Sequence, residues 1–300
     1  MTLPSTWRLW KDKLSGDLFF LLTLSTVLIV VLIGAGLWWK SAPILEGQSI
    51  GHLLFSKEWR PFSGHFGFWA YIVGSILVTG IAICIALPVS LLASIYLSEF
   101  APSRLRRFLL PLIDLLSGIP PIIYGVWGVL TIVPFIRVVL APHFVSFASG
   151  YSALAGGIIL AVMIFPLLVS ILLDVFRTIP EELKDASLSL GANEWETVRK
   201  VLLAKSAPGI LAATILAVSR ALGETIAVLM VCGNVAALPH SVFDPVYPLP
   251  ALIANNYGDM LSIPLYDSAL MLAALVLFGI IFVFNAISRL VLHRLERRRY

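Results

Sequence analysis

The chain has 300 residues, of which 59% are hydrophobic and only 13% charged, and its mean hydropathy is +0.96. This composition excludes a soluble globular protein. The net charge of +4 does not indicate nucleic-acid binding, because the basic residues cluster at the ends of hydrophobic runs. The two cysteines, Cys84 and Cys232, lie in or beside such runs and are interpreted as apolar packing residues, with no disulfide and no metal site.

Six hydrophobic runs are long enough to cross a hydrocarbon core of ~30 Å as helices. They cover residues 18–39, 68–97, 108–139, 151–176, 209–232 and 268–292. We therefore predict an all-α integral membrane protein with six transmembrane helices. The first run is too long for a signal peptide and has no small-residue cleavage site, so it is expected to remain as an anchor.

The third run contains a cluster of helix-breaking residues. Gly118, Pro120 and Pro121 follow one another within four positions. Because the two prolines remove two backbone donors, the cluster is expected to break or kink this helix.

The distribution of lysine and arginine predicts the orientation. An arrangement with both termini in the cytoplasm puts 16 of the 21 basic residues on the cytoplasmic side, and only four fall in the opposite loops. This is the asymmetry of the positive-inside rule. The loop between the fourth and fifth runs is then cytoplasmic as well.

That loop, residues 178–210, is polar and carries signals for two short amphipathic helices. Thr178 with Glu181 fits a capping box, and Asn193 with Glu196 fits a second one after Gly191. Apolar residues recur at helical spacing in both halves, at Leu183, Ala186 and Leu190, and at Trp195, Val198 and Leu202. Two interpretations stay open: a surface that docks into another protein, or a linker that folds back on its own chain.

The fifth run carries two charges. Arg220 lies about eleven residues from the cytoplasmic start of the run, a depth of ~16 Å. Glu224 is four residues further on, so a continuous helix would present both on one face. Such charges are kept in a membrane only where they face protein or water. The pair is either a neutral clamp between helices or part of an anion path, since the planar guanidinium suits an oxyanion.

No catalytic pattern is found. The chain has no Gly-Lys dipeptide and hence no Walker A loop, and no nucleophile elbow, zinc spacing or redox pair. The five histidines are scattered through loops and run edges. We do not expect an enzyme, and if ATP drives the protein, a different subunit binds it.

The loop resembles the cytoplasmic EAA loop of ABC-importer permeases. The family pattern falls on Asp185-Ala186-Ser187, Gly191 and Val201-Leu202-Leu203-Ala204, with departures at Asp185, Ser187, Val201 and Ala204. In that family the loop lies in a groove of the cytoplasmic ATPase and passes on its motion. The resemblance implies that the ATPase-coupling residues are Glu182, Asp185, Ala186, Ser187, Gly191, Trp195 and Leu203.

Two further segments resemble the phosphate-specific transport (Pst) permeases. Residues 219–234, SRALGETIAVLMVCGN, are similar to the family signature, and their second half resembles the PstC-type subunit. Residues 118–125, GIPPIIYG, are similar to the family's segment in span three, with Pro121 in place of serine. The resemblance runs from about residue 68 to the C-terminus. It implies a substrate path that includes Arg220, Glu224, Thr225 and Asn234, and a helix break at Gly118, Pro120 and Pro121.

The resemblance implies the type I ABC-importer permease fold, with residues 1–67 as an amino-terminal arm, first transmembrane helix and first outer loop, and residues 68–300 as the permease transmembrane domain. The expected function is import of inorganic phosphate by alternating access, as a multi-pass subunit of a prokaryotic cytoplasmic (inner) membrane. Expected partners are a homologous PstA-like permease, two PstB-like ATP-binding subunits, an extracytoplasmic phosphate-binding protein and the lipid bilayer, with no cofactor of its own.

Several alternatives remain open. The same architecture could move sulfate or molybdate, or the chain could be an ion-coupled carrier or channel without an ATPase. It could also be a scaffold that reports phosphate supply. The outer loop 236–264 is expected to form part of the outer mouth. Its Asp244, Asp259 and Asn255-Asn256 are expected either to contact the binding protein or simply to cap the loop.

Overall fold

A computed structural model describes residues 6–258, 263 and 265–297. The regular secondary structure of these residues is entirely helical, with loops between the helices and two isolated β-bridges. Six helical segments are long and apolar enough to span a membrane, which confirms the predicted number of spans. They are Lys13–Gly47, Trp69–Phe100, Pro121–His143, Ala153–Arg177, Glu194–Leu222 and Tyr266–Arg294.

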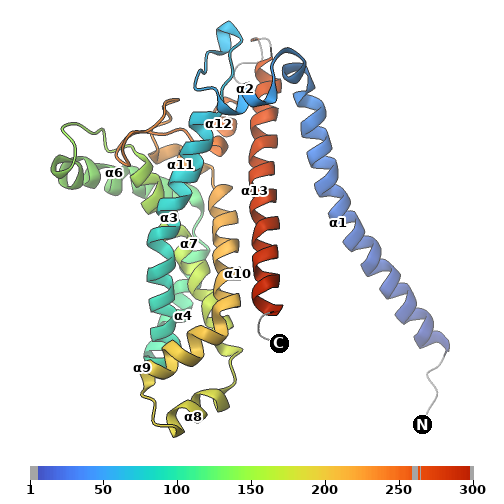
Figure 1. The fold of residues 1–300 in the computed structure, drawn as a ribbon, viewed down its shortest axis with the longest axis vertical. Helices are drawn as coiled ribbons and strands as arrows, with labels where there is room; N and C mark the ends of the chain where they lie inside the picture. Colours follow the sequence, from blue (N-terminus) through green and yellow to red (C-terminus); the bar gives the residue numbers. More distant parts are fainter. Residues whose placement is uncertain (1–5, 259–262, 264, 298–300) are drawn as a thin grey trace.

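The main helices follow the predicted runs in chain order. They are α1 (Thr6–Gly47), α2 (Ile50–Phe55), α3 (Trp69–Ile95), α4 (Ser103–Ser117), α5 (Pro121–Trp127), α6 (Val133–Phe135), α7 (Ala153–Arg177), α8 (Glu181–Ser189), α9 (Glu194–Thr197), α10 (Leu203–Leu222), α11 (Ile226–Val231), α12 (Leu249–Asn256) and α13 (Tyr266–Arg297). Figure 1 shows α8 and α9 at the end of the molecule toward which both termini point, and α2 and α12 at the opposite end. This arrangement agrees with the predicted common side for the termini and the loop 178–210.

The core is built around α7, the most buried span, which packs against α3, α10 and α4. Two adjacent glycines, Gly156 and Gly157, allow α3 to approach α7 closely. Small residues let helix backbones come together in a membrane, where dispersion contacts replace the hydrophobic effect. The two helices therefore form the rigid centre against which other segments are placed.

A glycine-to-alanine exchange tests this close approach. A Cβ added at Gly157 would lie 2.6 Å from the Cβ of Ile81 on α3, whereas one added at Gly80 would meet nothing within 4 Å. Overpacking of this kind costs about 1–3 kcal/mol. We expect Gly157→Ala to lower the thermal unfolding midpoint of the purified protein in detergent, and Gly80→Ala to leave it unchanged or raise it slightly, because alanine favours a helix more than glycine does. Equal midpoints for the two variants would contradict the packing described here.

By contrast, α1 is nearly uncovered. Figure 1 shows α1 leaning away from the bundle, and none of its most apolar window is buried within the chain. It contacts α13 near its outer end, where Gly34 faces Phe278 and where Ser41 and Ile44 are fully buried. The remaining surface of this apolar helix is left for lipid or for another membrane protein.

A second, aromatic cluster lies at the end where α2 and α12 are. Trp59 packs edge-on against Phe66 and Tyr71, and its ring lies 6.1 Å from that of Tyr266. The cluster joins the first outer loop to the beginning of α13. The outer end of the molecule therefore has a core of its own.

The third predicted run, 108–139, is not one helix. It divides between α4, which already begins at Ser103, and a span that begins at Pro121. The break at Gly118 and Pro120 that the sequence predicted is confirmed, because neither proline can continue the hydrogen-bond ladder and the residue before a proline is driven from helical geometry. Arg104, Arg106 and Arg107 give α4 a polar face, and α4 is not among the segments that are long and apolar enough to span a membrane.

The prediction that the fifth run, 209–232, forms one continuous helix was also wrong. The helix that covers the first part of this run, α10, begins earlier, at Leu203, and ends at Leu222, with Gly223 as its C-cap. Residues 223–225 separate α10 from the short helix α11. The fourth and sixth runs correspond to α7 and α13, although α13 is longer than predicted.

Candidate functional site

The two broken spans meet inside the bundle. The half-helix α5, which follows the break at Pro120, packs on the half-helix α11, which follows the break at Gly223. The contact needs a glycine, because a Cβ at Gly125 would lie 3.2 Å from the Cα of Ala227 and 2.6 Å from the Sδ of Met230. Discontinuous helices at the centre of a membrane protein are typical of substrate sites.

Arg220 lies next to this junction, near the end of α10. Its neighbour Ser219 donates a hydrogen bond of 3.2 Å to the side chain of Asn285 on α13. Asn285 is seven residues from the cytoplasmic end of the predicted sixth span, about 10 Å along a helix. This contact sets the end of α10 beside the part of α13 that the sequence assigns to the sixth span, and the depth of Arg220 in the membrane stays a prediction.

The guanidinium is on an uncovered face of the chain. Ala212, Leu216 and Arg220 recur every four residues on α10 and are all exposed, and Ile226, the first residue of α11, is exposed as well. A charge within the membrane is stable only against protein or water. If Arg220 lies in the membrane, this face must therefore be covered by a partner subunit or line an aqueous path.

Glu224 is not paired with Arg220. Among the described residues none of the ion pairs involves either side chain, and the prediction that both lie on one helix face was wrong. Because α10 ends at Leu222, Glu224 is in the break and turns elsewhere. Its Oε1 accepts a hydrogen bond of 3.2 Å from the Thr225 N–H, and it lines a narrow crevice with Ser75 and Thr79 of α3.

Thr225 and Asn234 mark the two ends of α11. The Thr225 hydroxyl donates to the carbonyl of Gly223, within the break. Asn234 has a left-handed backbone with φ 53°, and its Nδ2 donates 2.8 Å to the carbonyl of Leu229. Its Oδ1 is buried without a hydrogen-bond partner among the described residues, and the residue lines a cavity of about 320 Å³ with Tyr151. Glu224 and Asn234 therefore line different cavities, and the four residues predicted for the path do not converge on one point.

The polar residues of the outer loop that the structure describes cap their own chain. The Asp244 carboxylate accepts hydrogen bonds of 2.8 and 2.9 Å from the N–H groups of His240 and Ser241. Asn255 and Asn256 each donate 2.8 Å to the hydroxyl of Tyr247. Asp259 lies outside the described residues. Of the two interpretations of these side chains, the described contacts favour loop capping.

At the other end of the molecule, the loop 178–210 forms two short helices and a turn. Glu182, Asp185, Ala186 and Ser187 lie on α8, and Trp195 lies on α9. Gly191 stands between the helices with φ 89°, a left-handed conformation that glycine adopts without strain. Leu203 is the first residue of α10.

The two capping boxes predicted for this loop differ in outcome. The second is confirmed, since the Glu196 N–H donates 2.8 Å to Asn193 Oδ1 and the Asn193 N–H donates 3.1 Å to Glu196 Oε2. The first was wrong: Pro180 occupies the N-cap of α8, and the Thr178 hydroxyl instead donates to the carbonyl of Val175 at the end of α7.

The apolar side chains of the loop divide into two groups. Val198 and Leu202 are buried in the core of the chain. Leu190 is 90% exposed and Trp195 54% exposed, with Leu183 and Leu188 also exposed. A linker that folded back on its own chain would bury these side chains, so the structure leaves an apolar surface at the tip of the loop without a partner.

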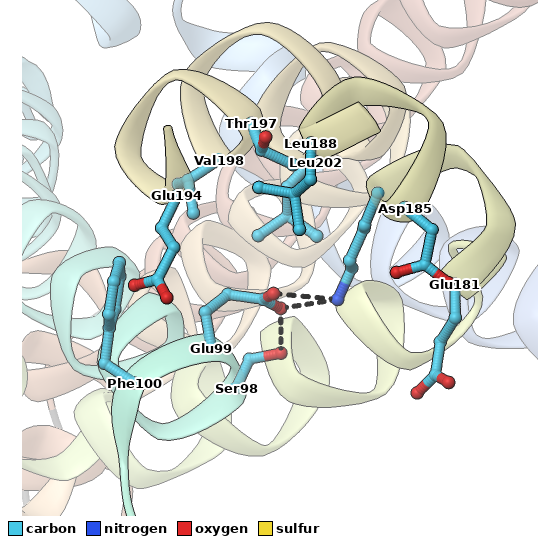
Figure 2. A pocket seen from close by; sticks show the side chains of 11 residues that line it. Ser98, Glu99, Phe100, Glu181, Asp185, Leu188, Glu194, Thr197, Val198 and Leu202 are labelled. Carbon is cyan, nitrogen blue, oxygen red and sulfur yellow. Dashed lines mark hydrogen bonds and ion pairs between the residues drawn. The ribbon is translucent and has the colours of Figure 1, made fainter. Parts of the chain in front are cut away.

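Sequence reasoning did not single out an ion pair that joins this loop to the bundle. Lys184 on α8 lies 2.8 Å from both carboxylate oxygens of Glu99, which belongs to the π-helical segment Tyr96–Phe100 at the end of α3. Figure 2 shows Glu99 with dashed lines to the lysine and to Ser98, inside a pocket of about 330 Å³ that α8 and α9 close. No local pattern could have revealed it, because the two residues are 85 positions apart.

Three comparisons with known proteins bear on this arrangement. The family model described as binding-protein-dependent transport system inner membrane component matches residues 86–299. A phosphate transport system permease protein PstC of Mesorhizobium japonicum is 36% identical over 91% of this chain and 88% of its own length. A probable PstC of Methanocaldococcus jannaschii is 37% identical over 93% of this chain and 94% of its own length.

Solved structures support the fold. A bacterial alginate ABC transporter, in complex with an alginate pentasaccharide-bound periplasmic protein, matches with a TM-score of 0.64 at 14% identity, over 96% of this chain and 98% of that chain. The methionine ABC transporter MetNI in an inward-facing conformation matches with a TM-score of 0.56 at 22% identity, over 76% of this chain and 94% of that chain.

Proposed function

The chain belongs to the binding-protein-dependent transport system inner membrane components, as a PstC-type permease, and from this we propose that it imports inorganic phosphate. As a member of this family it is a transport component of the inner membrane with the type I ABC-importer permease fold. The phosphate specificity, the driving ATPase and the site residues form the proposal.

The observation that carries the proposal is the position of Arg220. The sequence predicts that its guanidinium lies within the membrane layer, and the residue is on a face that the chain leaves uncovered, next to the junction of two broken helices. A planar guanidinium donates two parallel hydrogen bonds to an oxyanion such as phosphate. A homologous PstA-like permease set against the same face would enclose a path with Arg220 in its wall.

The exposed apolar tip of the loop 178–210 supports the proposed link to ATP. Two PstB-like ATPases would bind the nucleotide, and one would receive α8 and α9 in a surface groove, with contacts at Glu182, Asp185, Ala186 and Trp195. An extracytoplasmic phosphate-binding protein would deliver phosphate near Asn234. In this mechanism ATP binding closes the ATPase pair, the loop helices move with it, and the spans expose the path outward.

Reconstituted transport tests the proposal. The complete complex is placed in proteoliposomes, and uptake of labelled phosphate is measured with and without ATP, with sulfate as competitor. We expect ATP-dependent accumulation that sulfate does not reduce. Accumulation of sulfate instead would reject the substrate, and uptake without ATP would reject the coupling to an ATPase.

A further inference from the structure

We propose that Lys184 and Glu99 transmit the motion of α8 to the second span, so that this ion pair sets how much substrate moves for each ATP hydrolysed. This inference rests on the proposed function. It assigns a positioning role to two residues outside the EAA pattern and outside the substrate path.

The ion pair between Lys184 and Glu99 is short and largely buried. The lysine Nζ lies 2.8 Å from each carboxylate oxygen, and the Ser98 hydroxyl donates 2.7 Å to Glu99 Oε1. The Lys184 side chain is 21% exposed and that of Glu99 is 15% exposed. Burial reduces screening by salt and water, so the pair is held more strongly than ion pairs on an open surface.

The two other ion pairs described in the structure do not join separate elements. Arg177 pairs with Asp174 three positions away, and Lys200 pairs with Glu196 four positions away, and all four side chains are more exposed. Lys184 and Glu99 are separated by 85 positions and come from α8 and the end of α3. Of the described ion pairs, this one alone joins the loop to another span.

A second polar contact ties α8 to the fifth span. The hydroxyls of Ser187 and Thr197 lie 3.0 Å apart, and Thr197 is buried beneath α8. The short helix α8 is therefore held at two points, to span five through Ser187 and to span two through Lys184. A displacement of α8 would move both spans together, and loss of the lysine contact would leave span two behind.

The end of span two is suited to receive such a displacement. Residues Tyr96–Phe100 form a π-helical segment, and π-helical turns are frequent at functional sites. Leu97 in this segment is buried against Ile113, Val169 and Leu173. A pull on Glu99 would thus be passed to the tightly packed pair of α3 and α7 and not lost in a loose loop.

The test measures two rates in the same proteoliposomes that hold the whole complex: ATP hydrolysis and uptake of labelled phosphate. We expect Lys184→Met, which keeps the apolar stem, to hydrolyse ATP at close to the wild-type rate while phosphate moved per ATP falls about tenfold. Glu99→Gln should behave alike. The control is Lys200→Met. It removes an ion pair that lies within the same loop and connects it to no other span, so the phosphate moved per ATP should not change.

Exchanging the two charges distinguishes an ion pair that transmits motion from one that only stabilises the fold. The double variant Glu99→Lys with Lys184→Glu should recover most of the lost phosphate per ATP, and each single reversal should not. An unchanged ratio in Lys184→Met, or no recovery on exchange, would overturn the inference. A third outcome would also overturn it: the Lys184→Met complex fails to assemble, and the charge-exchanged double variant both assembles and moves the normal amount of phosphate per ATP. The ion pair would then only stabilise the fold. Wild-type complex that moves no phosphate would instead reject the proposed function.

Discussion

Replacement of Arg220 by alanine is expected to lower phosphate uptake by about ten- to a hundredfold while the complex still assembles. Arg220 is exposed and takes part in none of the ion pairs described in the structure, and its electrostatic interaction with Tyr124 of α5 is weak support for the fold, so its removal should leave the permease folded. A hydrogen bond to a charged group is worth about 1.5–3 kcal/mol. Each 1.36 kcal/mol corresponds to a tenfold change in rate.

Two variants sharpen this test. Arg220→Lys keeps the charge but loses the planar fork, so uptake between that of the wild type and that of the alanine variant is expected. Arg177→Ala removes an arginine from the exposed end of α7, where it pairs with Asp174, and should transport normally. If the Arg220→Ala complex fell apart, the arginine would be a structural clamp against a partner subunit. Normal uptake would remove it from the path.

Trp195→Ala is expected to weaken binding of the ATPase by about thirtyfold or more and to leave the permease folded. The side chain is 54% exposed at the tip of the loop, beside Leu190 at 90%. Large aromatic side chains at the centre of an interface commonly contribute about 2 kcal/mol or more. Because the ring packs little within its own chain, its loss should change the unfolding midpoint only slightly.

The binding is measured between the purified ATPase and the permease complex in nanodiscs. Leu190→Glu should weaken it as well, because the carboxylate would be desolvated in the groove. The control is Phe62→Ala, which removes a large hydrophobic side chain that is 86% exposed, about as much as that of Leu190, from the first outer loop. Undiminished binding by Trp195→Ala and Leu190→Glu together would show that the ATPase docks elsewhere.

The sequence by itself determined the features that depend on local order. Hydropathy and length gave the six spans, since a run of about twenty apolar residues crosses the membrane whatever its neighbours are. The distribution of lysine and arginine indicated a common side for the termini and the loop 178–210. Pro120 and Pro121 indicated the break in span three, because a proline removes a backbone donor in any context.

Local rules failed where two signals competed for one residue. Thr178 satisfies the pattern of a capping box, but the preceding helix α7 extends to Arg177 and takes the hydroxyl for its own last turn. Residues 209–232 read as one apolar helix, yet Gly223 ends α10, and α11 instead packs as a separate piece against α5. Hydropathy does not register such a break, since a glycine costs a helix only about 1 kcal/mol.

Only the tertiary structure decided which of these residues meet. The interruption at Gly223 turned Glu224 toward α3 and separated it from Arg220, although their spacing of four suits an ion pair on a continuous helix. In the opposite sense, Glu99 and Lys184 came together across 85 positions because α8, which packs on α9, reaches the end of span two. Helical periodicity acts over a few residues, whereas such pairs depend on how whole helices pack, and packing is a property of the complete fold.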